Sequence, residues 1–248
     1  MTKPPLSAQE KFPEFLADQR QFFDELISKD WETYQSPAWD KSRRFEIDRL
    51  FDRVSPRRIL DVGCGCGFHD VLMAGKAGVE EVVGIDYSEK SIETANRVYP
   101  HPHVSRRVED IAQAAGSGRY DLVISFQVIE HLVDATAFLR NCQAQTAPGG
   151  YVAVVTPNRL RLANRLRVMA GGKARLMDPQ HYREFVPKDL IALGEVLGLE
   201  YSAGFSYGLS IRVPMTRRTL FPTPVALRLG YLLSPLADCF CVVLKNNK

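Results

Sequence analysis

Short apolar runs alternate with longer amphipathic stretches along most of the chain. Apolar runs of this length predict buried strands, and the amphipathic stretches between them predict helices. We expect strands at 58–62, 81–85, 103–107, 120–125, 151–156, 199–206 and 238–244. Strands that alternate with helices are typical of a parallel α/β sheet covered by helices on both faces. The pattern therefore predicts a doubly wound sheet.

The helices of this alternation are expected near 67–77, 89–98 and 134–145. A further helix is expected to begin at Pro187, since proline is favourable at the first helical position, and to end at Gly198. Each of these helices follows one predicted strand and precedes the next. This order supports parallel strands joined by crossover helices.

The regular alternation does not cover the whole chain. Residues 1–54 carry apolar side chains at helical spacing, which predicts an N-terminal helical cap before a main domain at 55–248. Two segments, 157–181 and 207–236, fit no place in the alternation. Because both follow predicted strands, we expect them to be insertions on the substrate side of the sheet.

The first predicted strand runs into a loop with glycine at every second position, Asp61-Val-Gly-Cys-Gly-Cys-Gly67, and the next strand ends at Asp86. A strand, a glycine loop, a helix, a strand and an acid in this order are typical of a nucleotide-like ligand site. A dinucleotide loop would need its third glycine at position 68, where Phe68 stands. A nicotinamide cofactor is therefore disfavoured, and a plain glycine turn with a capping aspartate is the structural alternative.

Composition narrows the class of protein. The net charge of +3 over 248 residues does not indicate a nucleic-acid partner, and we expect none. Five cysteines without a disulfide spacing favour a reducing compartment, and the N-terminus shows no signal pattern, so a cytoplasmic location is expected. Cys64 and Cys66 lack the spacing of a zinc site.

Three blocks resemble the class I S-adenosylmethionine (SAM) methyltransferases. The D-x-G-x-G-x-G pattern at 61–67 resembles their motif I, 120–132 resembles their fourth strand and following loop, and Ala147-Pro-Gly-Gly150 resembles the turn before their fifth strand. The resemblance covers about residues 40–200. It implies SAM as cofactor and a Rossmann-like sheet of seven strands, mostly parallel, with an antiparallel last strand.

The resemblance implies a role for each residue of the cofactor site. Asp61 would position the amino group, Asp86 would accept hydrogen bonds from both ribose hydroxyls, and Tyr87 would lie on the adenine face. Asp110 would bind the adenine amino group, with a helix N-cap as its structural alternative. The backbone of Gln127 would lie near the sulfonium. The expected cofactor-binding set is Arg44, Asp61, Gly63, Gly65, Gly67, Asp86, Tyr87, Asp110, Ile111, Gln127 and Val128.

A narrower resemblance is to the ubiquinone-biosynthesis type of O-methyltransferase. Segments 156–159 and 181–190 and the pair Glu130-His131 are arranged as in that type. It also carries an arginine before the first strand; Arg43 or Arg44 would take that place, and we choose Arg44 for the methionine carboxylate. The sequence of 207–236 differs, so the acceptor cannot be carried over. Oxygen is the expected acceptor atom of a small molecule, with nitrogen and carbon as alternatives.

Methyl transfer to a hydroxyl or a carbon acid needs a proton acceptor. His131 follows the fourth-strand loop and His181 precedes the helix at Pro187, and histidine titrates near neutral pH. Glu130 is a third candidate for the base, and a structural hydrogen bond is the alternative for His131. Because no second carboxylate–histidine cluster accompanies Glu130, we expect no obligatory metal.

Two segments are basic and free of acids, from Pro157 to Met177 and from Tyr201 to Ala237. Three interpretations remain open: peripheral contact with anionic lipid headgroups, recognition of an anionic substrate, or a solvated helix face. A SAM- or nucleoside-binding scaffold without catalytic activity is the alternative from another class, because ligand binding alone does not establish chemistry.

Overall fold

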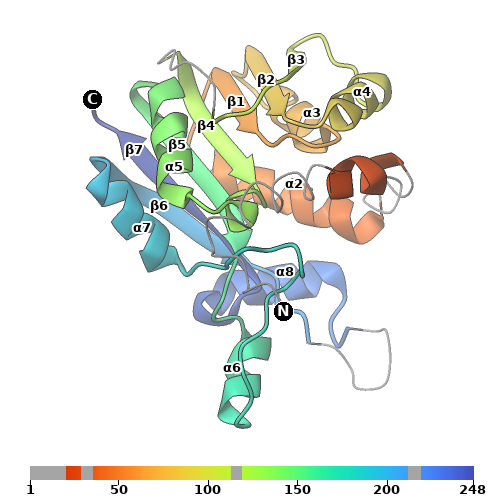
Figure 1. Cartoon of the computed structure of the whole chain (residues 1–248), viewed down its shortest axis with the longest axis vertical. Helices are drawn as coiled ribbons and strands as arrows, with labels where there is room; N and C mark the ends of the chain where they lie inside the picture. Colours follow the sequence, from red (N-terminus) through yellow and green to blue (C-terminus); the bar gives the residue numbers. More distant parts are fainter. Residues whose placement is uncertain (1–20, 29–35, 113–118, 212–218) are drawn as a thin grey trace, which may run out of the picture.

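A computed structural model describes residues 21–28, 36–112, 119–211 and 219–248 of the chain (Figure 1). Residues 21–28 form a helix, as the N-terminal pattern predicts, while the other residues before Ser36 lie outside the described part. The boundary between a cap at 1–54 and a domain at 55–248 stays a prediction. No helix in the described part is both long and apolar enough to cross a membrane.

Seven strands form one sheet in the order β3-β2-β1-β4-β5-β7-β6. Neighbours from β3 through β5 pair in parallel, and β7 pairs antiparallel with both β5 and β6. The seven-stranded, mostly parallel sheet with an antiparallel last strand is thereby confirmed. The strands are β1 (Arg58–Val62), β2 (Glu81–Asp86), β3 (Val104–Val108), β4 (Tyr120–Phe126), β5 (Thr146–Pro157), β6 (Leu199–Tyr207) and β7 (Cys239–Asn246).

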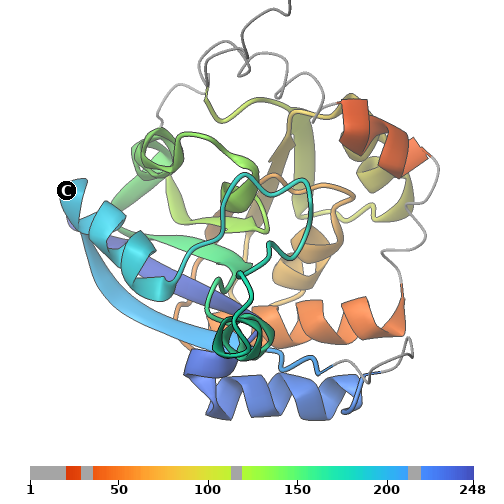
Figure 2. The same cartoon turned by 60° about the horizontal axis from the view of Figure 1, so that its bottom comes forward.

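Helices cover both faces of the sheet, as Figure 2 shows. Phe138 of α5 and Leu190 of α7 belong to the apolar core on one face. Leu50 of α2, Met73 of α3 and Leu227 of α8 belong to the core on the other face. The labelled helices are α2 (Pro37–Phe51), α3 (Phe68–Ala74), α4 (Glu89–Val98), α5 (Ala135–Gln145), α6 (Leu162–Met169), α7 (Pro187–Val196) and α8 (Thr223–Leu232).

Two boundaries differ from the sequence prediction by three residues or more. β5 begins at Thr146, before the Pro-Gly-Gly turn, because Thr146 pairs with Tyr120 and the next pair is Leu122 with Tyr151. The turn is therefore an irregularity within the strand. α3 ends at Ala74 rather than at residue 77, and Gly75 is its C-terminal cap.

The two insertions differ in how they pack against the rest of the protein. The segment 157–181 carries α6, which projects away from the body of the protein (Figure 1). The segment 207–236, of which 212–218 lie outside the described residues, carries α8, which packs against α2 and β6. The second insertion is therefore part of the helical layer.

A buried ion pair connects the glycine loop and α3 to β3, the strand at the edge of the sheet. The Arg106 Nε of β3 lies 2.6 Å from the Asp70 Oδ2 of α3, and both side chains are at most 1% exposed. The same guanidinium donates to the carbonyls of Gly67 at 3.2 Å and of Tyr99 at 3.1 Å. A Cβ on Gly67 would lie 2.6 Å from the Arg106 Nε. Glycine is therefore needed at 67 to admit Arg106.

Replacing Arg106 with methionine should lower the free energy of unfolding by ~3–5 kcal/mol, because Asp70 would keep a buried, unpaired carboxylate. Urea denaturation measures this change. The matched control is Arg107→Met, since the Arg107 side chain is 45% exposed in its pair with Glu109. We expect the control to change the stability by less than ~1 kcal/mol. Equal effects of the two variants would contradict this role for Arg106.

Candidate active site

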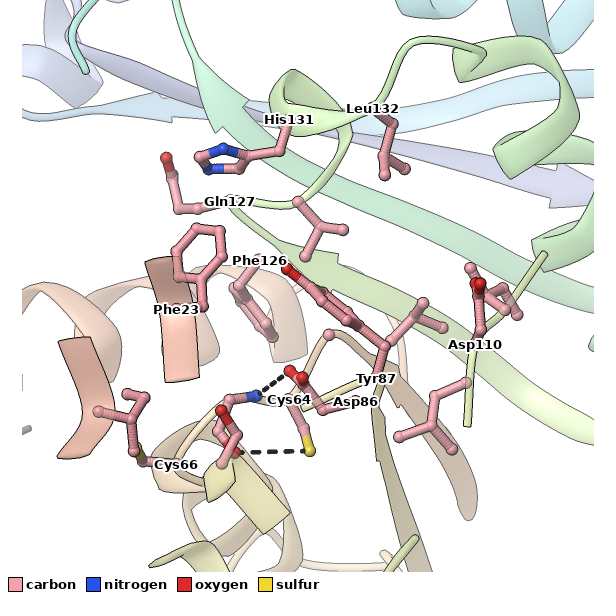
Figure 3. Close-up of a pocket in the computed structure, with 18 of the residues that line it drawn as sticks. Phe23, Cys64, Cys66, Asp86, Tyr87, Asp110, Phe126, Gln127, His131 and Leu132 are labelled. Carbon is pink, nitrogen blue, oxygen red and sulfur yellow. Dashed lines mark hydrogen bonds between the residues drawn. The ribbon is translucent and has the colours of Figure 1, made fainter. Parts of the chain in front are cut away.

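A cavity of about 1170 Å³ opens at the carboxyl ends of β1, β2 and β4 (Figure 3). In open α/β sheets, ligands bind at this edge, where the strand order reverses. The helix of residues 21–28 lies over the opening: the Ser88 hydroxyl donates to Asp24 at 2.5 Å, and the Phe23 ring packs edge-on against His131. Ligand pockets usually measure about 300–1000 Å³, so this cavity has room for a nucleotide-sized molecule and a second, smaller one.

The glycine loop and Asp86 form one wall of the cavity. The Gly65 N–H donates to one Asp86 carboxylate oxygen at 2.9 Å, and the Ser88 N–H donates to the other at 2.8 Å. Burial raises the pKa of Asp86 to about 6. A Cβ on Gly63 would lie 2.5 Å from Val128, whereas a Cβ on Gly65 would meet no protein atom within 4 Å. The space beside Gly65 is therefore open to the cavity.

Asp61 lies outside the residues that line the cavity, at the buried end of β1. Neither of its carboxylate oxygens has a hydrogen-bond partner among the described residues. Burial, together with the neighbouring Asp70 carboxyl, raises the pKa of Asp61 well above its ordinary value. The structure therefore does not bring Asp61 into the cavity wall, and its role toward the amino group of SAM stays a prediction.

A second wall contains Tyr87, Asp110, Ile111 and Val128, all of which line the cavity as expected. Asp110 also accepts a hydrogen bond from the Ala112 N–H at 2.9 Å. Its carboxylate thus closes a turn and still faces the cavity, so the structural and the functional interpretation are compatible. These side chains surround a space suited to a flat, weakly polar group such as adenine.

The backbone of Gln127 adopts a strained conformation. With φ at 57°, it is the one non-glycine residue of the described chain in the left-handed region. Its N–H donates to the Val155 carbonyl at 2.9 Å, which holds the turn after β4 in place. Strain of this kind is often found at ligand sites. Gln127 lines the cavity, as the resemblance implied.

The arginine that lines the cavity is Arg43, not Arg44. Arg44 lies on the exposed side of α2 and pairs with Asp40 at 3.0 Å. Adjacent residues of a helix point about 100° apart, so only one of the two can face the cavity. The Arg43 guanidinium lies 4.8 Å from the centre of the Phe68 ring, and burial lowers its pKa. Gly67, which was also expected to bind the cofactor, does not line the cavity. Its carbonyl accepts a hydrogen bond from Arg106 instead.

His131 is the member of the predicted catalytic set that lines the cavity. Its Nδ1 lies 3.1 Å from the Gln180 carbonyl oxygen, which acts as acceptor when Nδ1 carries the proton. That tautomer leaves the lone pair on Nε2. Burial and the adjacent His181 ring lower the pKa of His131 to about 4, so the ring is neutral at physiological pH.

His181 and Glu130 lie behind His131 rather than in the cavity wall. The His181 ring contacts the His131 ring edge-on at 4.8 Å, and its Nδ1 lies 3.2 Å from Glu184. Glu130 accepts a hydrogen bond from the Thr156 hydroxyl at 2.9 Å, and burial raises its pKa to about 7. His181 is therefore placed to position His131, and neither residue lines the cavity.

Ligand atoms of Glu130, His131 and His181 lie within 4.8 Å of one another, close enough to hold a metal ion. No other such group occurs in the described part of the chain. His181 joins this pair from 51 positions beyond Glu130 in the chain, which the sequence argument did not foresee. The expectation of no obligatory metal stays a prediction.

Sequence reasoning missed a second histidine in the cavity wall. His69 and Glu46 both line the cavity, and the His69 Nε2 lies 2.9 Å from the Glu46 Oε2. The His69 ring stacks on Phe126, with centroids 3.8 Å apart and planes 5° apart. A sequence signal existed: Trp39, Arg43 and Glu46 have the spacing of one helical face.

The described parts of the two basic insertions do not line the cavity. No described residue after Asn141 lines it. Arg161 is instead buried in a pair with Glu184, and Arg159 pairs with Asp189 at 3.3 Å. These contacts anchor the segment that carries α6, and they leave its remaining basic side chains on the outer surface. The position of the two insertions therefore does not support direct recognition of an anionic substrate.

Comparisons with known proteins agree with this geometry. The family model described as a methyltransferase domain matches residues 39–203. A ubiquinone biosynthesis O-methyltransferase of Chromobacterium violaceum is 31% identical over 216 residues, which cover 78% of this chain and 90% of that protein. The chain belongs to the SAM-dependent methyltransferases of class I, and SAM is the cofactor of this family.

Two further likenesses are informative. A probable SAM-dependent methyltransferase of Mycolicibacterium smegmatis is 32% identical over 65% of this chain, and the match spans 59% of that protein's length. The solved structure of magnesium protoporphyrin IX methyltransferase from Synechocystis, with bound SAH, has a TM-score of 0.63 and 16% identity, and covers 94% of this chain and 99% of that chain. The structural match supports the fold.

A methyl group on Gly65 should reduce SAM binding without loss of the fold. A Cβ there meets no protein atom, so it would enter the ligand's space. Gly78→Ala is the matched control, since Gly78 also has a positive φ and an open Cβ position but does not line the cavity. Both variants should lose about 1–2 kcal/mol of stability from backbone strain. Calorimetry should show weaker SAM binding for Gly65→Ala alone, and equal SAM affinities would contradict the assignment.

Proposed function

We propose that the protein transfers the methyl group of SAM to an oxygen atom of a small-molecule acceptor. One observation supports this most: a single cavity joins the glycine loop and Asp86 on one side to neutral or carboxylate-paired histidines on the other. The ubiquinone-type relatives support oxygen as the acceptor atom. Transfer to nitrogen or carbon and a non-catalytic SAM-binding scaffold are the alternatives.

The residues of the cavity suit SAM in their chemistry. SAM supplies a methyl group already activated by a positive sulfur, so the protein's main task is to position the acceptor in line and exclude water. We assign the ribose hydroxyls to Asp86 and the methionine carboxylate to Arg43 in place of Arg44. We assign the amino group of SAM to Asp61, and its adenine to the cavity wall formed by Tyr87, Asp110 and Ile111.

A hydroxyl acceptor must lose its proton, and we assign that proton to a histidine of the cavity wall. With Nδ1 donating to Gln180, His131 offers the Nε2 lone pair as a hydrogen-bond acceptor that can orient the acceptor hydroxyl. The Gln180 carbonyl and the His181 ring hold His131 in this orientation, so His181 acts as a positioning residue. The low pKa of His131 suits orientation, because the ring stays neutral.

The arginine assignment has a direct test. Arg43→Met should weaken SAM binding by roughly 10- to 100-fold, as expected for a lost hydrogen bond to a charged group. Arg44→Met, the neighbouring control, should change SAM affinity by less than about twofold, since its partner is Asp40 on the exposed side. Calorimetric titration with SAM measures both variants. A larger loss in the Arg44 variant would reverse the assignment.

Activity itself is tested by incubation with methyl-labelled SAM and separate pools of phenols, sugars and lipid extracts. We expect label to enter an acceptor and to be released when O-methyl ethers are cleaved. Label that survives ether cleavage would contradict oxygen as the acceptor atom. SAM binding without transfer to any pool would favour the scaffold alternative.

We also propose peripheral contact with anionic membranes through α6. Met169 is 82% exposed and is accompanied on this projecting segment by exposed Leu166 and Val168. Arg165 and Lys173 are exposed on the same segment. Apolar side chains flanked by basic ones are typical of interfacial helices. This surface would suit an acceptor that carries a lipid tail.

Liposome flotation tests the membrane contact. Wild-type protein should float with anionic vesicles at low salt, and Met169→Asp should reduce the floated fraction severalfold. Val196→Asp is the control, because Val196 is 80% exposed on α7, away from α6. Flotation that is equal for both variants, or absent for the wild type, would remove this proposal.

A further inference from the structure

We propose that His69, held by Glu46, is the base that takes the proton from the acceptor, and that the acceptor hydroxyl is a phenol. This inference rests on the proposed function and names its base and its substrate class. Neither residue was expected from the glycine-loop pattern. The argument depends on the geometry of the pair, on its charge and on the rings around it.

The geometry leaves one nitrogen of His69 for a ligand. Nε2 lies 2.9 Å from the Glu46 Oε2, so this nitrogen carries the proton in the neutral ring. Nδ1 has no hydrogen-bond partner among the described residues and keeps its lone pair. The ring cannot swing freely, because it stacks on Phe126 with centroids 3.8 Å apart. A base oriented by a carboxylate is the arrangement that nucleophile-activating sites use.

Charge favours His69 over His131 as the base. Taking up a proton makes an imidazolium, and Glu46 lies in contact with His69 to stabilise it. His131 instead has the Gln180 carbonyl and the His181 ring as its contacts, rather than a paired carboxylate. The other charged groups facing the pair are Arg43, beside Glu46 on α2, and Asp70 on the helix of His69 itself. The two cavity histidines therefore suit different roles, proton acceptance and orientation.

The surrounding rings indicate the class of acceptor. Phe126 stacks on His69, and Phe23 and Trp39 line the same cavity. Aromatic side chains favour stacked or edge-on contact with another flat ring. A phenol presents such a ring and places its hydroxyl at the edge, where a single imidazole nitrogen can reach it.

The step balances without a further reactant. The phenol proton passes to the His69 Nδ1, and the oxygen lone pair forms the new bond to the methyl carbon. The carbon–sulfur bond breaks at the same time, and its electron pair stays on sulfur, which becomes a neutral thioether. The imidazolium, paired with Glu46, returns its proton to water after the methyl ether leaves.

The test uses 4-nitrophenol, whose ionised form is yellow, bound to the full-length protein with S-adenosylhomocysteine. At a pH about one unit below the probe's own pKa, wild-type protein should raise the ionised fraction of bound probe severalfold, as a lowering of the probe pKa by about one unit would do. His69→Gln and Glu46→Gln should abolish this increase. The exposed control His103→Gln should retain it.

Circular dichroism and calorimetry with S-adenosylhomocysteine establish that each variant is folded and binds the product. Loss of the yellow signal in His131→Gln but not in His69→Gln would overturn the assignment of the base. A wild-type complex that does not ionise the probe would overturn this inference and leave the methyltransferase proposal intact. A wild-type protein that does not bind S-adenosylhomocysteine would instead overturn the proposed function.

Discussion

The buried ion pair between Arg106 and Asp70 is the interaction on which the cofactor side of the cavity depends. It joins β3 at the edge of the sheet to the first turn of α3, and its guanidinium also binds the carbonyl of Gly67. A buried charge without its partner is costly, so the loop has one favourable arrangement. The last glycine of the motif thus makes room for Arg106, while Gly65 borders the open space of the cavity.

The acceptor side of the cavity depends on α2. Ile47 and Leu50 anchor this helix in the core, and Arg43 and Glu46, on the same side of the helix, line the cavity. One packed helix therefore sets the positions of a cation in the cavity wall and of the carboxylate that contacts His69. The two histidines that line the cavity differ in their partners, a carboxylate for His69 and a second imidazole for His131. This difference is the physical basis for their separate proposed roles.

Most of the fold could be predicted because the central strands are buried on both faces and appear as continuous apolar runs. Leu60, Val83 and Val123 illustrate this, each nearly inaccessible to solvent. The start of β5 at Thr146 could not be predicted from an apolar run. Its first residue, Thr146, pairs with Tyr120, and the Pro-Gly-Gly segment separates this pair from the rest of the strand. The composition of that segment indicates a turn, so the pattern places the start of the strand after it.

The sequence by itself determined the ligand class, because the glycine spacing, Phe68 and Asp86 belong to one βαβ unit whose members lie close in the chain. The tertiary structure decided which side chains meet in the cavity. Whether Arg43 or Arg44 faces inward depends on the rotation of α2 against the core, and the pairing of Glu46 with His69 depends on how α2 lies against α3. Contacts between distant residues follow from packing, and the local pattern of the chain does not encode the angle at which two helices meet.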